Sequence, residues 1–141
     1  MPEARESKGL YRSRVIRGKD RLTAIYENGS VFRSSSVLVR FLLEPNRYQP
    51  QEPVQVAFTI SRRVGNAVRR NQIRRWMRES IRLRFSELQR IPVPVDNTLS
   101  IVLSYRSVTG TSPGWKEIQS SVESVVGRLV ALGEKGFSAR H

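Results

Sequence analysis

The stretch from Arg62 to Arg84 places the strongest limit on the fold, because it combines dense positive charge with apolar residues at helical spacing. It holds nine arginines, no lysine and one acidic residue, Glu79. At about 100° per residue, apolar residues of this stretch and of the residues just after it gather on one side of a helix: Ile73, Trp76, Met77, Ile81, Phe85 and Leu88. The pattern predicts a long helix that is capped by Asn66, runs from Ala67 to about Gln89, and packs its apolar side on a core.

The opposite side of this predicted helix carries polar residues within a sector of about 100°, which we call the arginine face. Its members are Asn71, Arg74, Arg75, Arg78 and Arg82. Like charges four residues apart destabilise an isolated helix by a few tenths of a kcal/mol per pair, so the arginine face lowers the stability of this helix. Because arginine binds phosphate bidentately, we interpret the face as a binding surface rather than an ordinary solvated one.

The turn before the helix adds to this surface. Arg62 and Arg63 precede Val64-Gly65-Asn66, and glycine permits the backbone to approach a phosphate closely. The adjacent helix N-terminus has free N–H groups that favour an anion. A turn followed by a helix cap explains the same residues equally simply, and the two basic clusters around it favour the binding interpretation.

The composition indicates a polyanionic partner and excludes several kinds of active site. The 141 residues carry a formal net charge of +13, with 21 arginines against 4 lysines. Such a charge repels itself in a compact state, and its usual compensation is a nucleic acid. There is no cysteine and the single histidine is the terminal His141, so thiolate sites, histidine-rich metal sites and a Ser-His-Asp triad are excluded. Asp20 and Asp96 are far apart in the chain and form no metal motif.

The hydropathy pattern indicates neither a membrane segment nor a targeting segment. No apolar run approaches the roughly 20 residues of a membrane span. The N-terminus lacks the apolar core of a signal peptide. We therefore expect a cytoplasmic protein that does not bind a membrane.

The remaining pattern predicts a single α+β domain. Residues 1–13 are polar and unpatterned, and we expect them to be disordered. The expected elements, in chain order, are a helix at 19–28 ended by Gly29, strands at 37–43 and 54–61, the long helix, a strand at 99–105, and a last helix that starts at Ser112 and Pro113 and ends at Gly133.

The first two predicted strands are separated by a loop with three prolines, and this spacing predicts an antiparallel hairpin. In the second strand apolar residues alternate with short or polar ones, so one of its faces lies toward the core. Arg40 stands in the first strand where the alternation requires a core residue, and the pattern offers no explanation for it.

The segment SRRVGNAVRRNQIRRWMRESIR, residues 61–82, closely resembles the signature of the protein subunit of bacterial ribonuclease P. The residues that match the family pattern are Arg62, Arg63, Gly65, Asn66, Arg70, Asn71, Arg74, Arg75 and Arg78. Gln72 departs from it, since the family has an arginine there, and we expect a weakened contact rather than lost function. The resemblance covers about residues 14–132 and leaves a C-terminal tail at 133–141.

The resemblance implies a fold of order α-β-β-β-α-β-α, with a single-layer mixed sheet of about four strands, three helices and a left-handed βαβ crossover. The first strand is short and would lie near residues 31–32. In such a fold the matching arginine-rich residues, with Arg82, face the catalytic RNA subunit.

The resemblance also implies a cleft between the first helix and the sheet that accepts the single-stranded 5′ leader of precursor tRNA. Its positions map to Leu22, Tyr26, Val39, Phe41 and Thr59. Leu22 departs from the usual aromatic residue, so one stacking surface is lost, whereas Tyr26 and Phe41 keep theirs. Stacking on a ring tolerates any base, which suits an enzyme with many leaders. For Leu22, Val39 and Phe41, an ordinary core position remains an equally good interpretation.

The function implied by the resemblance is that of a ribonuclease P subunit, which assists removal of the 5′ leader from precursor tRNA. The catalytic Mg²⁺ would be held mainly by the RNA, so we expect no catalytic or metal-binding residue in this chain, and no obligate protein partner. Three alternatives remain: a ribosomal or other structural RNA-binding protein, a stand-alone metal-dependent nuclease, and a helix-turn-helix DNA-binding protein. The last lacks the partner helix that its motif needs beside the long helix.

Overall fold

The computed structural model describes residues 14–34, 36–45, 52–106 and 113–137. The expected disorder of residues 1–13 lies outside these ranges. In chain order, the helices and strands are α2 (Lys19–Asn28), β1 (Ser30–Ser34), β2 (Val37–Pro45), β3 (Val54–Ile60), the 3₁₀ turn η2 (Arg62–Val64), α3 (Ala67–Leu88), β4 (Asn97–Tyr105) and α4 (Trp115–Lys135). The α+β class and the short first strand are confirmed.

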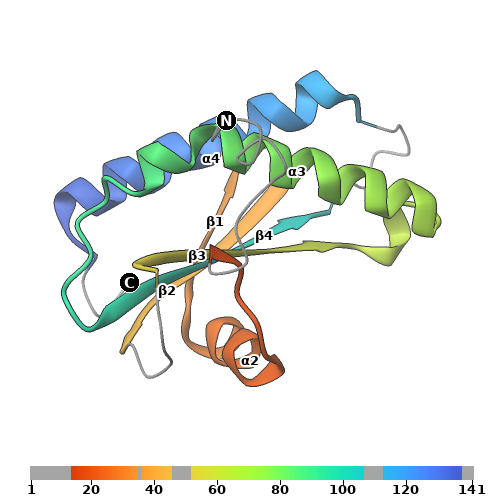
Figure 1. Cartoon of the computed structure of the whole chain (residues 1–141). Coiled ribbons are helices and arrows are strands. Elements are labelled where there is room, and N and C mark those ends of the chain that lie inside the picture. Colours follow the sequence, from red (N-terminus) through yellow and green to blue (C-terminus); the bar gives the residue numbers. More distant parts are fainter. Residues whose placement is uncertain (1–13, 35, 46–51, 107–112, 138–141) are drawn as a thin grey trace, which may run out of the picture.

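The four strands form one mixed sheet of order β1-β2-β4-β3. β2 pairs antiparallel with both β1 and β4, whereas β3 pairs parallel with β4. Helix α3 connects the parallel neighbours β3 and β4, and is therefore the helix of the βαβ crossover that the resemblance implies. Helices α3 and α4 lie side by side on one face of the sheet, and α2 lies on the other face (Figure 1).

The predicted antiparallel hairpin of the strands at 37–43 and 54–61 is wrong. β4 lies between β2 and β3 and pairs with both of them. The physical reason lies in β4, which is buried at every position from Thr98 to Tyr105. A strand buried on both faces belongs at the centre of a sheet, and here its two partners are β2 and β3.

Alternation along the strands divides the interior into two apolar layers. The larger layer lies between the sheet and helices α3 and α4, and includes Val37, Val39, Phe41, Val56, Ile73, Met77, Ile101, Leu103, Val122 and Val126. The smaller one lies beneath α2 and consists of Ile16, Ile25, Ala57 and Val102, with Leu22 and Leu42 packed at its edge. Because side chains of adjacent residues point to opposite faces, Leu38, Arg40 and Leu42 of β2 lie on the α2 side.

The predicted end of the last helix at Gly133 is also wrong. Helix α4 continues to Lys135 and ends at Gly136, which has a φ of 90°. Gly133 is buried inside the helix, and an added Cβ there would lie 2.6 Å from Cγ2 of Ile91. This glycine therefore permits close packing of α4 against the segment after α3, and the stop signal is the next glycine along the chain.

Gly29 ends α2 as predicted, for a reason that the sequence does not show. Its N–H donates to the carbonyl oxygen of Ile25 at 2.8 Å. An added Cβ would lie 2.6 Å from that oxygen and 2.9 Å from the carbonyl oxygen of Phe41. The absence of a side chain thus allows the end of α2 to lie directly against β2.

Candidate nucleic-acid interface

The structure confirms the two sides of the predicted long helix. Asn66 caps α3 by accepting a hydrogen bond from the N–H of Arg69 at 2.9 Å. The apolar side is buried at Ile73, Met77, Ile81, Phe85 and Leu88, and Trp76 packs partly buried against the same core. On the arginine face, Asn71 and Arg75 are exposed and the other members are half-buried.

Contacts within the arginine face leave two of its guanidinium groups available. Arg74 donates to Oδ1 of Asn71 at 2.7 Å, and Arg82 forms an ion pair with Glu79. The hydrogen bond from Arg82 lowers the pKa of Glu79, so its carboxylate is charged at neutral pH. The side chains of Arg75 and Arg78 make no hydrogen bond or ion pair with any other residue that the structure describes. These two side chains can bind an anion without breaking an internal contact.

The turn before α3 is held by its own hydrogen bonds. The hydroxyl of Ser61 accepts from the N–H of Arg63 at 3.2 Å, and Arg70 donates to the carbonyl oxygen of Gly65 at 2.7 Å. A Cβ on Gly65 would lie 3.1 Å from Cγ of Arg69, so a side chain fits poorly there. Arg62, like Arg63, is exposed beside the N-terminus of α3, whose N–H groups favour an anion. The predicted basic turn thus directly precedes the helix that carries the arginine face.

Arg69 lies outside the predicted site, and its contacts explain why glutamine rather than arginine stands at position 72. The guanidinium of Arg69 donates to the side-chain oxygen of Gln72 and to the carbonyl oxygen of Pro113, the latter at 2.8 Å. It also lies 5.7 Å from the centre of the Trp76 ring. Gln72 therefore holds Arg69 against the start of α4. An arginine at this position could not accept that hydrogen bond.

Arg84 serves packing between helices. Its guanidinium donates to Glu87 of α3 at 2.9 Å and pairs with Glu123 of α4, also at 2.9 Å. These hydrogen bonds, the one to Glu87 first, raise the pKa of Arg84. The side chain thus connects α3 to α4 and is separate from the arginine face.

On the α2 side of the sheet, three of the predicted leader positions lie on a shared face. Leu22 is partly buried at the edge of the smaller core, and Tyr26 is 43% exposed. Thr59 of β3 forms a hydrogen bond of 2.6 Å with Ser104 of β4. The guanidinium of Arg40 lies 4.5 Å from the centre of the Tyr26 ring, within the range of a cation–π contact. Arg40 is therefore a surface residue of this face, which explains its place in the strand.

The structure does not bring Val39 and Phe41 to this face. Their side chains belong to the larger core on the opposite side of the sheet, with exposed fractions of 0% and 7%. A shift of one residue along a strand moves a side chain to the other face, so the predicted set is displaced by one position in β2. The β2 residues on the α2 side are Leu38, Arg40 and Leu42.

A buried polar group fixes α2 on the sheet, and no sequence pattern pointed to it. Arg21 of α2 donates to the hydroxyl of Ser100 at 2.9 Å and lies 3.4 Å from the carboxylate of Glu44. Ser100 also donates to Glu44 at 2.7 Å. The three residues come from α2, β2 and β4, so they position Leu22 and Tyr26 over the sheet.

The described part of the chain holds neither a metal-binding cluster nor a helix suited to a membrane. Within residues 14–34, 36–45, 52–106 and 113–137, no three His, Asp or Glu side chains lie close enough to hold a metal ion. None of the helices in these ranges combines the length and apolar character that a membrane crossing requires.

Comparison with known proteins identifies the family. Residues 10–130 match the sequence model of the family described as Ribonuclease P. The chain belongs to this family. The ribonuclease P protein component of Coprothermobacter proteolyticus is 44% identical over 71 residues, which cover 50% of this chain and 54% of that protein. The component of Chlorobaculum tepidum is 25% identical over 137 residues, which cover 93% of this chain and 89% of that protein.

Solved structures of ribonuclease P proteins share the fold. The protein of Staphylococcus aureus superposes with a TM-score of 0.65 at 22% identity, covering 82% of this chain and 94% of that one. The protein of Thermotoga maritima gives a TM-score of 0.61 at 20% identity, covering 81% and 96%. At such identities the likeness supports the mixed sheet with its three helices, and the roles of individual residues require their own argument.

Proposed function

We propose that this ribonuclease P protein component binds the ribonuclease P RNA through the arginine face and the 5′ leader of precursor tRNA through the α2 side of the sheet. The observation that carries the proposal is the placement of these two surfaces. α3 and α2 lie on opposite faces of one sheet (Figure 1), so one small domain can contact two RNAs at once. The net charge of +13 reduces repulsion between the two polyanions.

The arginine face suits a sugar–phosphate backbone. Arg75 and Arg78 have no internal hydrogen-bond partner among the described residues, and Arg62 and Arg63 are exposed at the turn beside them. Each guanidinium can form a bidentate contact with phosphate. Such contacts displace counterions and read no base, so the affinity should depend strongly on salt.

The α2 side suits a single strand of variable sequence. The exposed ring of Tyr26 offers a face on which a base can stack, and Leu22 and Thr59 line the surface beside it. Arg40 takes the place that Val39 and Phe41 held in the prediction, and supplies a positive charge for the leader phosphates. Stacking without base-specific hydrogen bonds fits a substrate class whose leaders differ.

The chemistry of cleavage is assigned to the RNA by the family resemblance. In that mechanism Mg²⁺ is held mainly by the RNA, and the protein's residues bind and position the substrate. Several carboxylates in the described part of this chain form ion pairs with arginine, as at Glu79, Glu44 and Glu123. These pairs maintain the fold and the two surfaces.

Reconstitution tests the proposal. A bacterial ribonuclease P RNA is mixed with the purified chain, and release of the 5′ leader from precursor tRNA is measured at low Mg²⁺. We expect the chain to raise the rate with RNA, and to give none alone after nuclease treatment has removed contaminating RNA. A chain that binds RNA without raising cleavage would support a structural RNA-binding protein. Cleavage by the protein alone would support a stand-alone nuclease.

A further inference from the structure

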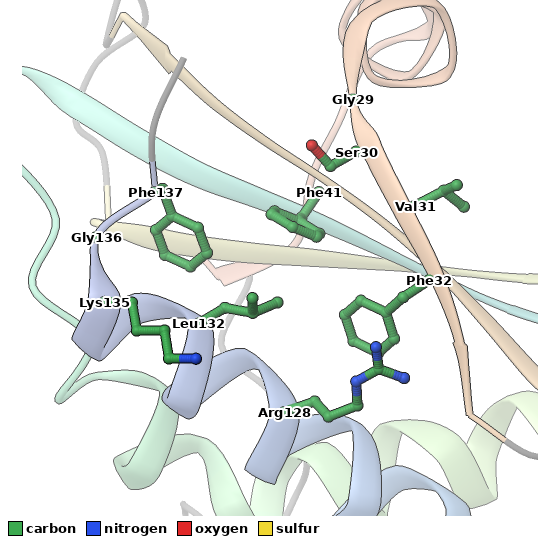
Figure 2. A pocket seen from close by; sticks show the side chains of 10 residues that line it. All are labelled: Gly29, Ser30, Val31, Phe32, Phe41, Arg128, Leu132, Lys135, Gly136 and Phe137. Atoms are coloured by element: carbon green, nitrogen blue, oxygen red, sulfur yellow. The ribbon is translucent and has the colours of Figure 1, made fainter. Parts of the chain in front are cut away.

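A cavity of about 530 Å³ lies between the start of β1 and the C-terminal part of α4. Its walls include the rings of Phe32, Phe41 and Phe137 together with Leu132, while Arg128 and Lys135 lie on its α4 side (Figure 2). A volume within roughly 300–1,000 Å³ is typical of small-molecule sites. The cavity shares no residue with the arginine face or with the leader positions on the α2 side.

The three rings are tilted relative to one another, so they do not stack face to face and part of their surface stays uncovered by the neighbouring rings. The centres of Phe32 and Phe41 are 6.1 Å apart with a tilt of 58°, and those of Phe41 and Phe137 are 5.4 Å apart with a tilt of 57°. Phe41 is almost fully buried, whereas Phe32 and Phe137 are half-buried. The cavity is therefore a pocket with an apolar aromatic lining that accepts a flat ring.

Two cations lie beside this lining. The guanidinium of Arg128 is 4.3 Å from the centre of the Phe32 ring and donates to the carbonyl oxygen of Arg33 at 3.2 Å. Lys135 stands in the last turn of α4 and is exposed. Neither side chain forms an ion pair with a carboxylate in the described part of the chain. Their charges are available to an anionic ligand.

An aromatic-lined pocket beside two cations matches one nucleotide, with its base against a ring and its phosphate at the cations. We propose that this pocket holds an unstacked nucleotide of the ribonuclease P RNA. The proposal rests on the proposed function. Phe32 and Phe41 pack in the core layer between the sheet and helices α3 and α4, so their rings lie on the side of the sheet that carries α3. The leader surface lies on the other side, which favours the catalytic RNA over the substrate.

The test measures affinity of the full chain for a ribonuclease P RNA transcript at several salt concentrations. Phe137→Leu keeps an apolar side chain but removes the ring, and should weaken binding by about 5- to 140-fold, the range expected for loss of one stacked base. Lys135→Ala should flatten the salt slope by about 0.7, as for one phosphate contact on a single strand. Lys116→Ala is the matched control, since Lys116 is exposed at the opposite end of the same helix and outside the pocket.

A photoreactive benzophenone side chain at position 137 identifies the ligand in the reconstituted enzyme. We expect a cross-link to one unpaired position of the catalytic RNA. Cross-links to the precursor tRNA leader, or spread over many positions, would overturn the proposal. Equal salt slopes for Lys135→Ala and Lys116→Ala would also overturn the proposal. This comparison stays valid even if Phe137→Leu destabilises the fold. The variant Arg75→Ala is measured in parallel. If Arg75→Ala loses affinity for the RNA and the pocket variants do not, the pocket proposal is rejected and the proposed function is retained.

Discussion

Replacement of Arg75 by alanine should weaken assembly with a ribonuclease P RNA and flatten the salt dependence of that assembly. Arg75 is exposed on the arginine face and its guanidinium has no hydrogen bond or ion pair with another described residue, so the change removes no such internal contact. Removing one arginine–phosphate pair lowers the slope of log affinity against log salt by about 0.9 for a duplex or 0.7 for a single strand. Between 50 and 200 mM salt, a change of 0.9 corresponds to about a 3.5-fold smaller loss of affinity.

The effect should grow with the number of arginines removed. If each guanidinium contacts one phosphate, a triple replacement of Arg74, Arg75 and Arg78 should lower the slope by about 2.7 on a duplex. The assay is equilibrium binding of protein to RNA at four or more salt concentrations. Thermal unfolding of each variant is followed in parallel, so that a folding defect is separated from a binding defect.

Arg84→Ala is the control with the same change in charge. Arg84 connects α3 to α4 through Glu87 and Glu123, so its loss should lower the midpoint of thermal unfolding and leave the salt slope unchanged. If Arg84→Ala flattened the slope as much as Arg75→Ala, positive charge would act diffusely. The assignment of phosphate binding to the arginine face would then be refuted.

Three further substitutions test local features of the structure. Glu79→Gln should raise RNA affinity because it releases the guanidinium of Arg82. Since the pKa of Glu79 is lowered from 4.5, the stability that the ion pair contributes is complete above about pH 4.5 and is lost as the pH falls through the lowered pKa. Unfolding curves of wild type and variant should therefore converge in acid, and their continued separation would contradict the pairing. Gly29→Ala should lower the free energy of unfolding by roughly 1–3 kcal/mol in urea titrations, because its Cβ meets two carbonyl oxygens, and a change under about 0.5 kcal/mol would show that α2 moves freely. Asn66→Ala should cost about 1 kcal/mol because the helix cap is removed, and an unchanged urea midpoint would argue against the cap.

Local patterns predicted the elements of this fold well because each depends on nearby residues. The spacing of apolar residues in α3, its cap at Asn66 and the stop at Gly29 are all properties of short segments. The position of β1 came only from the family resemblance, since a strand of five residues at the edge of a sheet carries little periodicity.

Features that depend on residues distant in the chain were not predictable from the pattern. The pairing of β2 and β3 with β4 is decided by burial of β4 on both faces, which a loop between neighbouring strands does not reveal. Gly133 looks like a helix stop until its contact with Ile91 is known.

The candidate site also contains features that local sequence predicts and features that it does not. The arginine face follows from helical periodicity alone, and the structure confirms its geometry. Val39 and Phe41 were placed in the cleft by the family resemblance, and the structure puts their side chains on the face opposite α2, because a one-residue shift along a strand exchanges its faces. Arg40 lies beside Tyr26 on the α2 side, and a charged residue in an otherwise apolar strand was the one available signal for that side.

The central claim, that the α2 side binds the leader, is tested most directly by the affinity of the reconstituted enzyme for precursor and mature tRNA. The measurement compares Tyr26→Ala with Tyr26→Phe, at protein concentrations that saturate the catalytic RNA. Tyr26→Ala should weaken precursor binding by roughly 1–3 kcal/mol, the value of one stacked base, and leave mature tRNA binding unchanged. Tyr26→Phe keeps the ring and should bind both as the wild type does. Equal losses of affinity for precursor and mature tRNA with Tyr26→Ala would contradict the account.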